Sequence, residues 1–416
     1  MKLLLLTDIP PAQGFTAGLV MKRLCSFVPP EWLACYAVIS PGLGLTLDPE
    51  FSWLPIHYAN KPSERISRRL GRQAGTLFSL ARDAYNTRVI LPRVLRDATE
   101  FGRKVGAEAI WCPVQGPFMI RLARRLAKQL QVPLLAQVYD PPDWWLISNN
   151  IDRFSQRRIF AEYQALLRES KRIAAASWAM AEAYQNQYNT PAIPLIPSLD
   201  RRLVQPPQPA PSQDAPFTLA LAGQIYATEE FEALLAALDS VAWQVAGRSI
   251  RFQVLSRQLH ISANRPRRIE FLGWYEQAAG IRQLSQASAL YCPYRFDPQH
   301  EPEARLSFPS KLTTYLVTGR PIFFHGPRYA SPALFLEKYA AAELCYTLEP
   351  ADILQRIETL IRDPAQGAQL ARNAARAFEE NLTLEIYHQQ FAAFLGVPQA
   401  DLVPVDLENP VAGSTA

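Results

Sequence analysis

The chain has 416 residues, of which 49% are hydrophobic and 19% charged, and its formal net charge at pH 7 is +5. This balance is typical of a folded globular protein and excludes a largely disordered chain, while the length suits two domains. No apolar run approaches the roughly 18–20 residues that a bilayer-spanning helix needs, so no transmembrane segment is predicted.

The chain starts with an apolar run that ends at Asp8. This run is too short for the apolar region of a secretory signal peptide and predicts a buried strand instead. The five cysteines are scattered and contain no Cys-x-x-Cys pair, which predicts neither a disulfide framework nor a zinc site and favours a reducing compartment. We therefore expect a cytoplasmic protein.

In the first half of the chain, short apolar runs alternate with amphipathic stretches, the pattern of parallel strands joined by helices. Continuous apolar strands fit a sheet that helices cover on both faces. The predicted strands are 3–6, 34–39, 109–112, 134–138, 173–176 and 193–196, and the predicted helices are 18–27, 119–130, 155–169 and 179–188.

The second half repeats this pattern and ends in two consecutive helices. The predicted strands are 218–222, 250–255, 269–272, 289–293, 321–325 and 344–347. The predicted helices are 229–241, 278–287, 309–318, 331–339, 350–362, 366–380 and 382–395.

Prolines mark the division between the halves, because eight of the 35 prolines fall between Pro191 and Pro216. Proline fixes φ and removes a backbone donor, so this segment is predicted to be an extended, stiff connector. The predicted fold class is α/β, with two doubly wound (Rossmann-like) domains facing across a cleft. We expect domains at 1–199 and 200–375, C-terminal helices at 376–396 that pack back toward the first domain, and a loose tail at 397–416.

The segment 305–321 has the features of an anion site at a helix start. Ser307 can cap the helix and Pro309 suits its first turn. That turn would present free backbone N–H groups together with the Ser310 hydroxyl and the Lys311 ammonium, a combination that suits a phosphate or pyrophosphate. The alternative is a capped surface helix whose lysine is only solvated.

Two loops that directly follow predicted strands contain glycine. Gly223 permits close approach of a ligand to the backbone, and so does the loop with Gly14 and Phe15, although each can also be an ordinary turn between strand and helix. Neither loop is a G-x-G-x-x-G fingerprint, and the sequence contains no G-x-x-x-x-G-K-[ST]. Nicotinamide dinucleotide and P-loop chemistry are therefore disfavoured.

The loop 139–145 places Asp140 and Asp143 beside two tryptophans. Carboxylates and flat apolar rings together suit a sugar, because they match its hydroxyls and its C–H faces. A proline turn over buried tryptophans is the alternative. The five histidines have no metal-ligand spacing, so no metal site is predicted, and only His325, at a strand end, is a candidate functional histidine.

Several of these segments, taken in order, resemble the GT-B glycosyltransferases of the family-4 (group 1) type, over roughly residues 2–395. The resemblance includes Pro-Pro-x-x-Gly at 10–14, Ile-Pro-Ser-Leu-Asp at 196–200, Gly-Gln-Ile-Tyr at 223–226 and Phe-Leu-Gly-Trp at 271–274. Its most specific part is Pro-Ser-Lys-Leu at 309–312 followed by Gly-Arg-Pro at 319–321, which is similar to the colanic-acid glycosyltransferase-like branch.

The resemblance implies a retaining, metal-independent enzyme without a cofactor, which moves a sugar from a nucleoside diphosphate sugar to a polysaccharide or lipid-linked acceptor. It assigns the acceptor to the first domain and the donor to the second. The implied residues are Ser310, Lys311 and Gly223 for the donor phosphates, Thr314 and Tyr294 for the ribose and nucleotide, Asp140 as a catalytic residue, and Gly14 and Phe15 for the sugar and acceptor.

The chain departs from the family pattern at two places. Leu306 and Thr314 occupy the positions of two glutamates that are eight residues apart in the family. Residues 224–232 contain no Lys or Arg, where the family has a basic pair. Glu301 and Glu303 are candidate acidic substitutes. The alternative function is a non-catalytic glycosyltransferase-like protein that binds a nucleotide or glycan.

Residues 61–104 contain eleven basic and four acidic residues, so all of the excess positive charge of the chain lies in this stretch. Part of this stretch falls on one helix face, which suits a peripheral contact with anionic lipid on the inner side of a membrane; a solvated face is the alternative. No aromatic or groove-reading motif accompanies the charge, so no nucleic-acid partner is expected. The residues of this face are Arg65, Arg68, Arg69 and Arg72.

Overall fold

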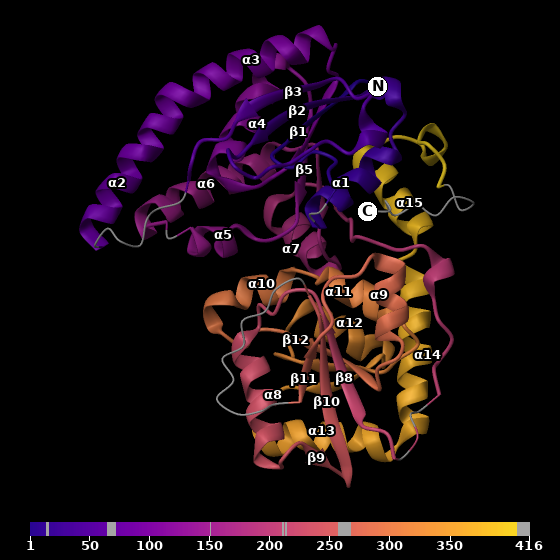
Figure 1. The fold of residues 1–416 in the computed structure, drawn as a ribbon. Coiled ribbons are helices and arrows are strands. Elements are labelled where there is room, and N and C mark those ends of the chain that lie inside the picture. The colour runs from indigo at the N-terminus through magenta and orange to yellow at the C-terminus, as the bar shows by residue number, and fades with distance from the viewer. Residues whose placement is uncertain are drawn as a thin grey trace. The chain divides into compact units, whose positions relative to one another are not determined.

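The computed structural model describes residues 1–13, 16–64, 72–149, 151–209, 212, 214–256 and 268–405. These residues form two compact units (Figure 1). The first unit comprises Met1–Leu195 together with His388–Val405, and the second comprises Ile196–Tyr387.

The first unit is built on a parallel sheet in which, within the described residues, seven strands follow the order β3-β2-β1-β4-β5-β6-β7. Four of these strands, β1, β2, β4 and β5, are buried along almost their whole length, as their continuous apolar sequences require. The strands are β1 (Leu3–Thr7), β2 (Leu33–Ile39), β3 (Ile56–Asn60), β4 (Ala109–Pro113), β5 (Leu134–Val138), β6 (Arg172–Ala175) and β7 (Ala192–Pro194).

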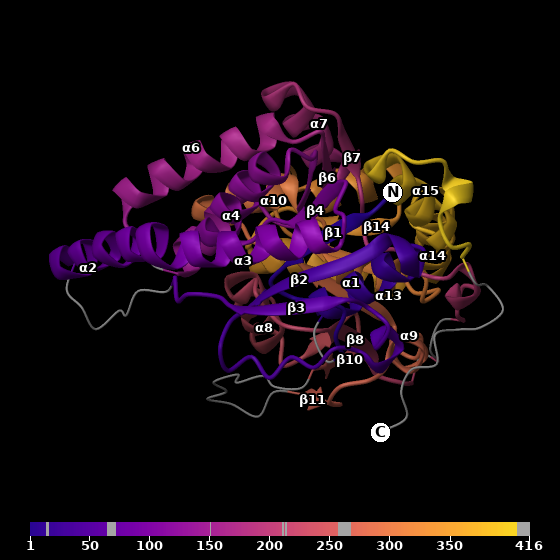
Figure 2. The same cartoon turned by 90° about the horizontal axis from the view of Figure 1, so that it is seen from above.

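Helices connect these strands. Two of them, α2 and α3, follow one another through a π-helical turn at Asn86–Ile90 and form one long helical segment (Figure 2). The helices are α1 (Thr16–Ser26), α2 (Arg72–Tyr85), α3 (Leu91–Lys104), α4 (Gly116–Leu130), α5 (Pro142–Ser148), α6 (Arg153–Glu169) and α7 (Trp178–Tyr188).

The second unit has a parallel sheet in the order β11-β10-β8-β12-β13-β14, with the short β9 antiparallel to β10. Its core includes Phe252, Tyr291 and Phe323, which are fully buried. The strands are β8 (Phe217–Ala222), β9 (Gln244–Val245), β10 (Arg248–Leu255), β11 (Ile269–Phe271), β12 (Ala289–Pro293), β13 (Ile322–His325) and β14 (Ala342–Cys345).

Along the chain, the helices of the second unit connect these strands and continue after the last of them (Figure 1). They are α8 (Thr228–Ser240), α9 (Gln277–Leu284), α10 (Glu301–Leu306), α11 (Ser310–Leu316), α12 (Ser331–Tyr339), α13 (Pro350–Arg362) and α14 (Pro364–Asn381), and α15 (Leu384–Leu395) follows.

Both sheets reverse their strand order beside their first strand. The reversal lies between β1 and β4 in the first unit and between β8 and β12 in the second. The chain therefore leaves these neighbouring strands toward opposite faces of the sheet, which opens a crevice beyond their carboxyl ends. Loops that follow β8 and β12, and likewise β1 and β4, are the places where a ligand of each unit is expected.

The end of the chain packs on the first unit. Phe391 of α15 lies 5.1 Å from Trp111 and 6.3 Å from Phe27 between ring centres. The Val403 N–H donates to the Phe27 carbonyl at 2.8 Å, and Leu402 is buried. Residues 397–405 are thus held in place, in contrast to the loose tail that the sequence predicts, while 406–416 lie outside the described residues.

The segment 191–216 also differs from the extended connector that its prolines predict. It contains the edge strand β7 and a 3₁₀ turn at Arg201–Leu203. The backbone N–H groups of Gln205 and Gln208 donate to the carbonyls of Val317 at 2.7 Å and Gly319 at 3.0 Å. From Ile196 on, the proline-rich stretch is therefore part of the second unit and is hydrogen-bonded within it.

Candidate functional site

The loop after β8 presents bare backbone at the switch point of the second unit. Gly223 has φ +78°, and apart from its chain neighbours no heavy atom of the described residues lies within 4 Å of the place where a Cβ would stand. The preceding Ala222 N–H donates to the Tyr315 hydroxyl at 2.8 Å, which fixes the end of β8 against α11. A ligand can therefore approach the backbone closely at Gly223.

Lys311 reaches this loop from α11. Its Nζ donates to the Gln224 carbonyl at 2.9 Å and lies 4.7 Å from the centre of the Tyr226 ring. The side chain is half-buried. Burial lowers the pKa of Lys311 to about 8, although the neighbouring Cys292 thiol opposes this shift. The ammonium stays charged at pH 7 and is bound to the loop that follows the exposed Gly223.

Arg295 reaches the same loop from the other side of the switch point. It follows β12, its Nε donates to the Tyr226 carbonyl at 2.7 Å, and its guanidinium lies 5.7 Å from the Tyr226 ring centre. Tyr294 meets that ring edge-on at 6.0 Å. Two cations from separate elements thus lie close to Tyr226. The buried hydroxyl of Tyr226 has no hydrogen-bond partner among the described residues.

The other predicted donor residues lie near this point. Ser310 is exposed and Thr314 half-buried on α11, while Tyr294 is buried and donates its hydroxyl to the Ser307 carbonyl at 3.2 Å. The prediction that Ser307 caps this helix is wrong. The cap residue is Pro309, which provides no side-chain hydrogen bond, because α10 ends at Leu306 and Ser307 terminates it instead.

The two candidate acidic substitutes differ in their surroundings. Glu301 is half-buried, with its side chain 41% exposed, and pairs with Arg305 at 2.7 Å. Glu303 is largely buried, and its Oε2 lies 3.7 Å from Nη1 of Arg295. Only Glu303 therefore lies beside the cations of the second-unit switch point.

The first unit has a buried charge cluster at its own switch point. Lys61, after β3, donates to Asp8 Oδ2 at 2.9 Å and to the Gln115 carbonyl at 3.1 Å, and lies 3.7 Å from Glu64. Glu64 accepts a hydrogen bond from the Phe118 N–H at 2.7 Å, at the start of α4. Burial alone would lower the pKa of Lys61, but the two carboxylates outweigh it and raise that pKa. Burial raises the pKa of Glu64.

Asp140 lies at the same edge of the first sheet, two residues after β5, and is half-buried. Asp143, in the first turn of α5, has its pKa raised by burial. Gly14 and Phe15 lie outside the described residues. The loop 139–145 therefore connects β5 to α5, a helix that the sequence did not predict.

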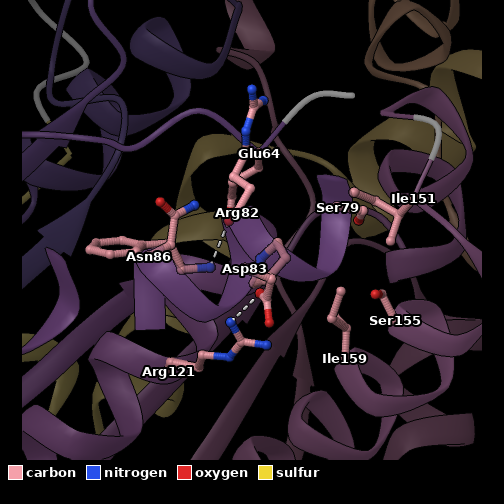
Figure 3. A pocket seen from close by; sticks show the side chains of 11 residues that line it. Glu64, Ser79, Arg82, Asp83, Asn86, Arg121, Ile151, Ser155 and Ile159 are labelled. Carbon is pink, nitrogen blue, oxygen red and sulfur yellow. Dashed lines mark hydrogen bonds and ion pairs between the residues drawn. The ribbon is translucent and has the colours of Figure 1, made fainter. Parts of the chain in front are cut away.

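Figure 3 shows a small pocket in the first unit, next to this charge cluster. Its volume is about 30 Å³, which is room for water but not for a sugar. Arg121 is buried there and bonds Asp83 at 2.5 Å, Glu162 at 2.7 Å and the Thr87 hydroxyl at 2.8 Å. These contacts join α4 to α6 and to the α2–α3 segment.

His325 is a core residue. It is fully buried and hydrogen-bonded to the Tyr291 hydroxyl and the Thr347 carbonyl, each at 2.8 Å. Burial lowers its pKa to about 4, so the imidazole is neutral at pH 7. In the part of the chain that the structure describes, no three His, Cys, Asp or Glu side chains are grouped to hold a metal ion.

The basic stretch is described only in part. Arg65, Arg68, Arg69 and the side chain of Arg72 lie outside the described residues. Within α2, Leu77 is 70% and Tyr85 55% exposed. Among the described residues, no helix is long and apolar enough to cross a membrane.

Similarity to known proteins is found at the level of structure. No family model and no curated protein sequence matches the chain. HepE of Anabaena, solved with UDP-glucose, is similar with a TM-score of 0.62 and 14% identity, over 95% of this chain and 100% of that one. Sucrose-phosphate synthase of Thermosynechococcus elongatus gives 0.63 and 12%, over 95% and 98%.

A lipopolysaccharide outer core galactosyltransferase, WaaB, solved in its apo form, gives a TM-score of 0.58 and 11% identity, over 95% of this chain and 99% of that one. These structural neighbours are GT-B glycosyltransferases. At such identities the likeness shows the fold, and the predicted class of two doubly wound α/β units of the GT-B type is confirmed.

Proposed function

We propose that the chain is a glycosyltransferase of the family-4 type, which moves a sugar from a nucleoside diphosphate sugar to a polysaccharide or lipid-linked acceptor. The observation that carries this proposal is the position of Lys311 above the exposed Gly223 loop, at the switch point of the second unit of a GT-B fold. Solved neighbours with this fold include HepE with UDP and with UDP-glucose.

Lys311 and Ser310 would hold the donor diphosphate over Gly223, with Thr314 and Tyr294 on the nucleotide side. Departure of the nucleoside diphosphate builds negative charge on its phosphates, and a fixed ammonium beside bare backbone N–H groups stabilises that charge without a metal. The reaction is proposed to be retaining. Continued turnover in the presence of EDTA, with product stereochemistry read by NMR, tests both points.

Tryptophan fluorescence during titration with UDP, GDP and ADP tests the donor site, because the second unit contains the 56% exposed Trp274. Lys311→Ala is expected to weaken diphosphate binding by about 10- to 100-fold, the worth of one charge-assisted contact. Lys338→Ala is a matched control, since that lysine also lies over a tyrosine ring, 5.0 Å from the Tyr339 centre, on exposed surface. Equal binding by Lys311→Ala and the parent would refute the site.

Asp140 is proposed to face the transferred sugar with the loop of Gly14 and Phe15. It lies at the carboxyl edge of the first sheet, where ligands of doubly wound sheets bind. Asp140→Asn is expected to lose turnover by about 100-fold or more while donor binding is kept. Unchanged turnover would remove Asp140 from the site.

We further propose that the 61–104 stretch rests on an anionic membrane on its cytoplasmic face, where a lipid-linked acceptor is found. Support comes from the exposed Leu77, Phe78 and Tyr85 on α2, where Arg82 lies 4.5 Å from the centre of the Phe78 ring. Cosedimentation with vesicles that contain phosphatidylglycerol tests this contact. Binding that survives Leu77→Ser with Tyr85→Ser would contradict it.

A non-catalytic protein that binds a nucleotide or glycan is the second candidate. The observation in its favour is that Leu306 and Thr314 provide no carboxylate where the resembled family has two. Incubation with a panel of nucleoside diphosphate sugars and lipid-extract acceptors separates the two functions, because reproducible donor turnover ends this alternative.

A further inference from the structure

The loop after β8 has no basic residue of its own, yet two cations are fixed to it. Residues 224–232 contain no Lys or Arg. Lys311 binds the Gln224 carbonyl from α11, and Arg295 binds the Tyr226 carbonyl from the loop after β12. We propose that Arg295 is a second phosphate-binding residue of the donor site. It follows a different strand and supplies the positive charge that the loop after β8 lacks. The proposal rests on the proposed function.

The strand order makes this substitution possible. β8 and β12 are direct neighbours in the sheet, paired at Leu219 with Ala289 and at Ala220 with Leu290. Their following loops therefore leave from adjacent carboxyl ends, on the two sides of the crevice where a ligand is expected. A side chain that starts 69 residues away from Tyr226 in sequence thus reaches the same place in space.

Lys311 and Arg295 both lie near the ring of Tyr226. The Lys311 ammonium lies 4.7 Å and the Arg295 guanidinium 5.7 Å from the centre of the Tyr226 ring. The negative face of an aromatic ring attracts a cation, so Tyr226 helps to hold both side chains in place. Two positive charges beside one residue at the switch point suit a ligand with two phosphate groups.

The inner nitrogen of Arg295 fixes its orientation and leaves its outer edge for a ligand. Nε is committed to the Tyr226 carbonyl at 2.7 Å, whereas Nη1 meets Glu303 only at 3.7 Å. That separation is longer than a hydrogen bond, so a phosphate oxygen can take a direct bond that Glu303 does not make. The side chain is 23% exposed, which gives a ligand access to it.

The competing explanation is that Arg295 only ties the two loops together. In that case its loss would lower the stability of the protein and weaken every nucleotide by the same factor. A phosphate contact instead predicts a loss that is larger for diphosphates than for the matching monophosphates. The ratio of the two affinities therefore separates the explanations.

The test measures the binding of UDP, GDP, ADP and their monophosphates to the full chain by calorimetry, for the parent, Arg295→Gln and Arg295→Lys. Arg305→Gln is the matched control, because that arginine is 51% exposed and, among the described residues, contacts Glu301 and the Tyr329 ring rather than the loop after β8. We expect Arg295→Gln to weaken diphosphate binding by about 10- to 100-fold. The monophosphates should lose less, Arg295→Lys should recover part of the loss, and Arg305→Gln should match the parent.

A second measurement needs no variant. Phenylglyoxal modifies arginines in the parent, and mass spectrometry follows each site. UDP at saturation is expected to slow modification at Arg295 and to leave the rate at Arg305 unchanged. Equal rates at Arg295 with and without a bound diphosphate would overturn the assignment.

The outcomes distinguish this inference from the proposed function. If the parent binds none of the diphosphates, the donor site itself is refuted. If the parent binds one and Arg295→Gln binds it as tightly, or loses mono- and diphosphate equally, the donor site stands and the role of Arg295 is refuted.

Discussion

Raising the pH from 7 to 9 is expected to weaken the binding of a nucleoside diphosphate about tenfold, because Lys311 loses its proton over this range. Burial lowers the pKa of its ammonium to about 8. With that pKa, the charged fraction falls from about 0.9 at pH 7 to about 0.1 at pH 9. If the diphosphate binds only the charged form, its dissociation constant rises in inverse proportion.

Binding should also take up protons, since the bound phosphates stabilise the ammonium and raise its pKa. At pH 8 the uptake is expected to be about half a proton per ligand. Titration calorimetry in two buffers with different ionisation enthalpies measures this number directly. A phosphate group with a second pKa of about 6 is already ionised there and contributes little.

Lys311→Arg provides the control, because a guanidinium stays charged throughout this range. Its affinity should be flat between pH 7 and pH 9, and its proton uptake at pH 8 should vanish. An equal slope in Lys311→Arg and in the parent would show that another group titrates, and would refute the assignment of Lys311 to the phosphates.

Three further predictions concern single residues. Gly223→Ala and Gly247→Ala should each lower the unfolding free energy by about 1 kcal/mol, because both glycines have a positive φ and open space around them. Only Gly223→Ala should weaken nucleotide binding. Equal nucleotide affinities of the two variants would contradict the site. His325 should lower the unfolding free energy of the parent by about 3 kcal/mol as the pH falls from 6.5 to 4. In the unfolded chain its imidazole takes up a proton over this range, whereas the folded, buried imidazole has a pKa of about 4 and stays largely neutral. Denaturation of His325→Gln at pH 7 and pH 4 should show a smaller difference, and an equal one would be evidence against this residue. Gly319→Ala should destabilise the protein by more than Gly223→Ala in thermal unfolding, because its added methyl would strike the Pro206 carbonyl.

Much of the fold could be predicted from local sequence. The strands at 134–138 and 289–293 and the helix at 331–339 coincide with β5, β12 and α12, because a continuous apolar run or an amphipathic stripe identifies a buried element. β3 was missed, since it is an edge strand whose side chains are mostly half-buried or exposed. Its sequence, Ile-His-Tyr-Ala-Asn, therefore has no continuous apolar run.

The candidate site could be predicted only where its residues are close in sequence. Lys311 and Ser310 share one helix start with a recognisable pattern, whereas Arg295 depends on a partner 69 residues away. In the first unit, Lys61 and Asp8 are separated by 53 residues. Such pairs follow from the order of strands in a sheet, and that order is not contained in any local segment.

Because His388–Val405 belong to the first unit, that unit cannot be completed until these late residues have been synthesised. The polypeptide leaves the ribosome from its N-terminus, so Trp111 and Phe27 are made long before Phe391, which covers them. Residues Ile196–Tyr387 are all synthesised before this segment, so the second unit is complete while part of the core of the first unit is still uncovered. A nascent chain stalled before this last segment is therefore expected to be the form most in need of a chaperone.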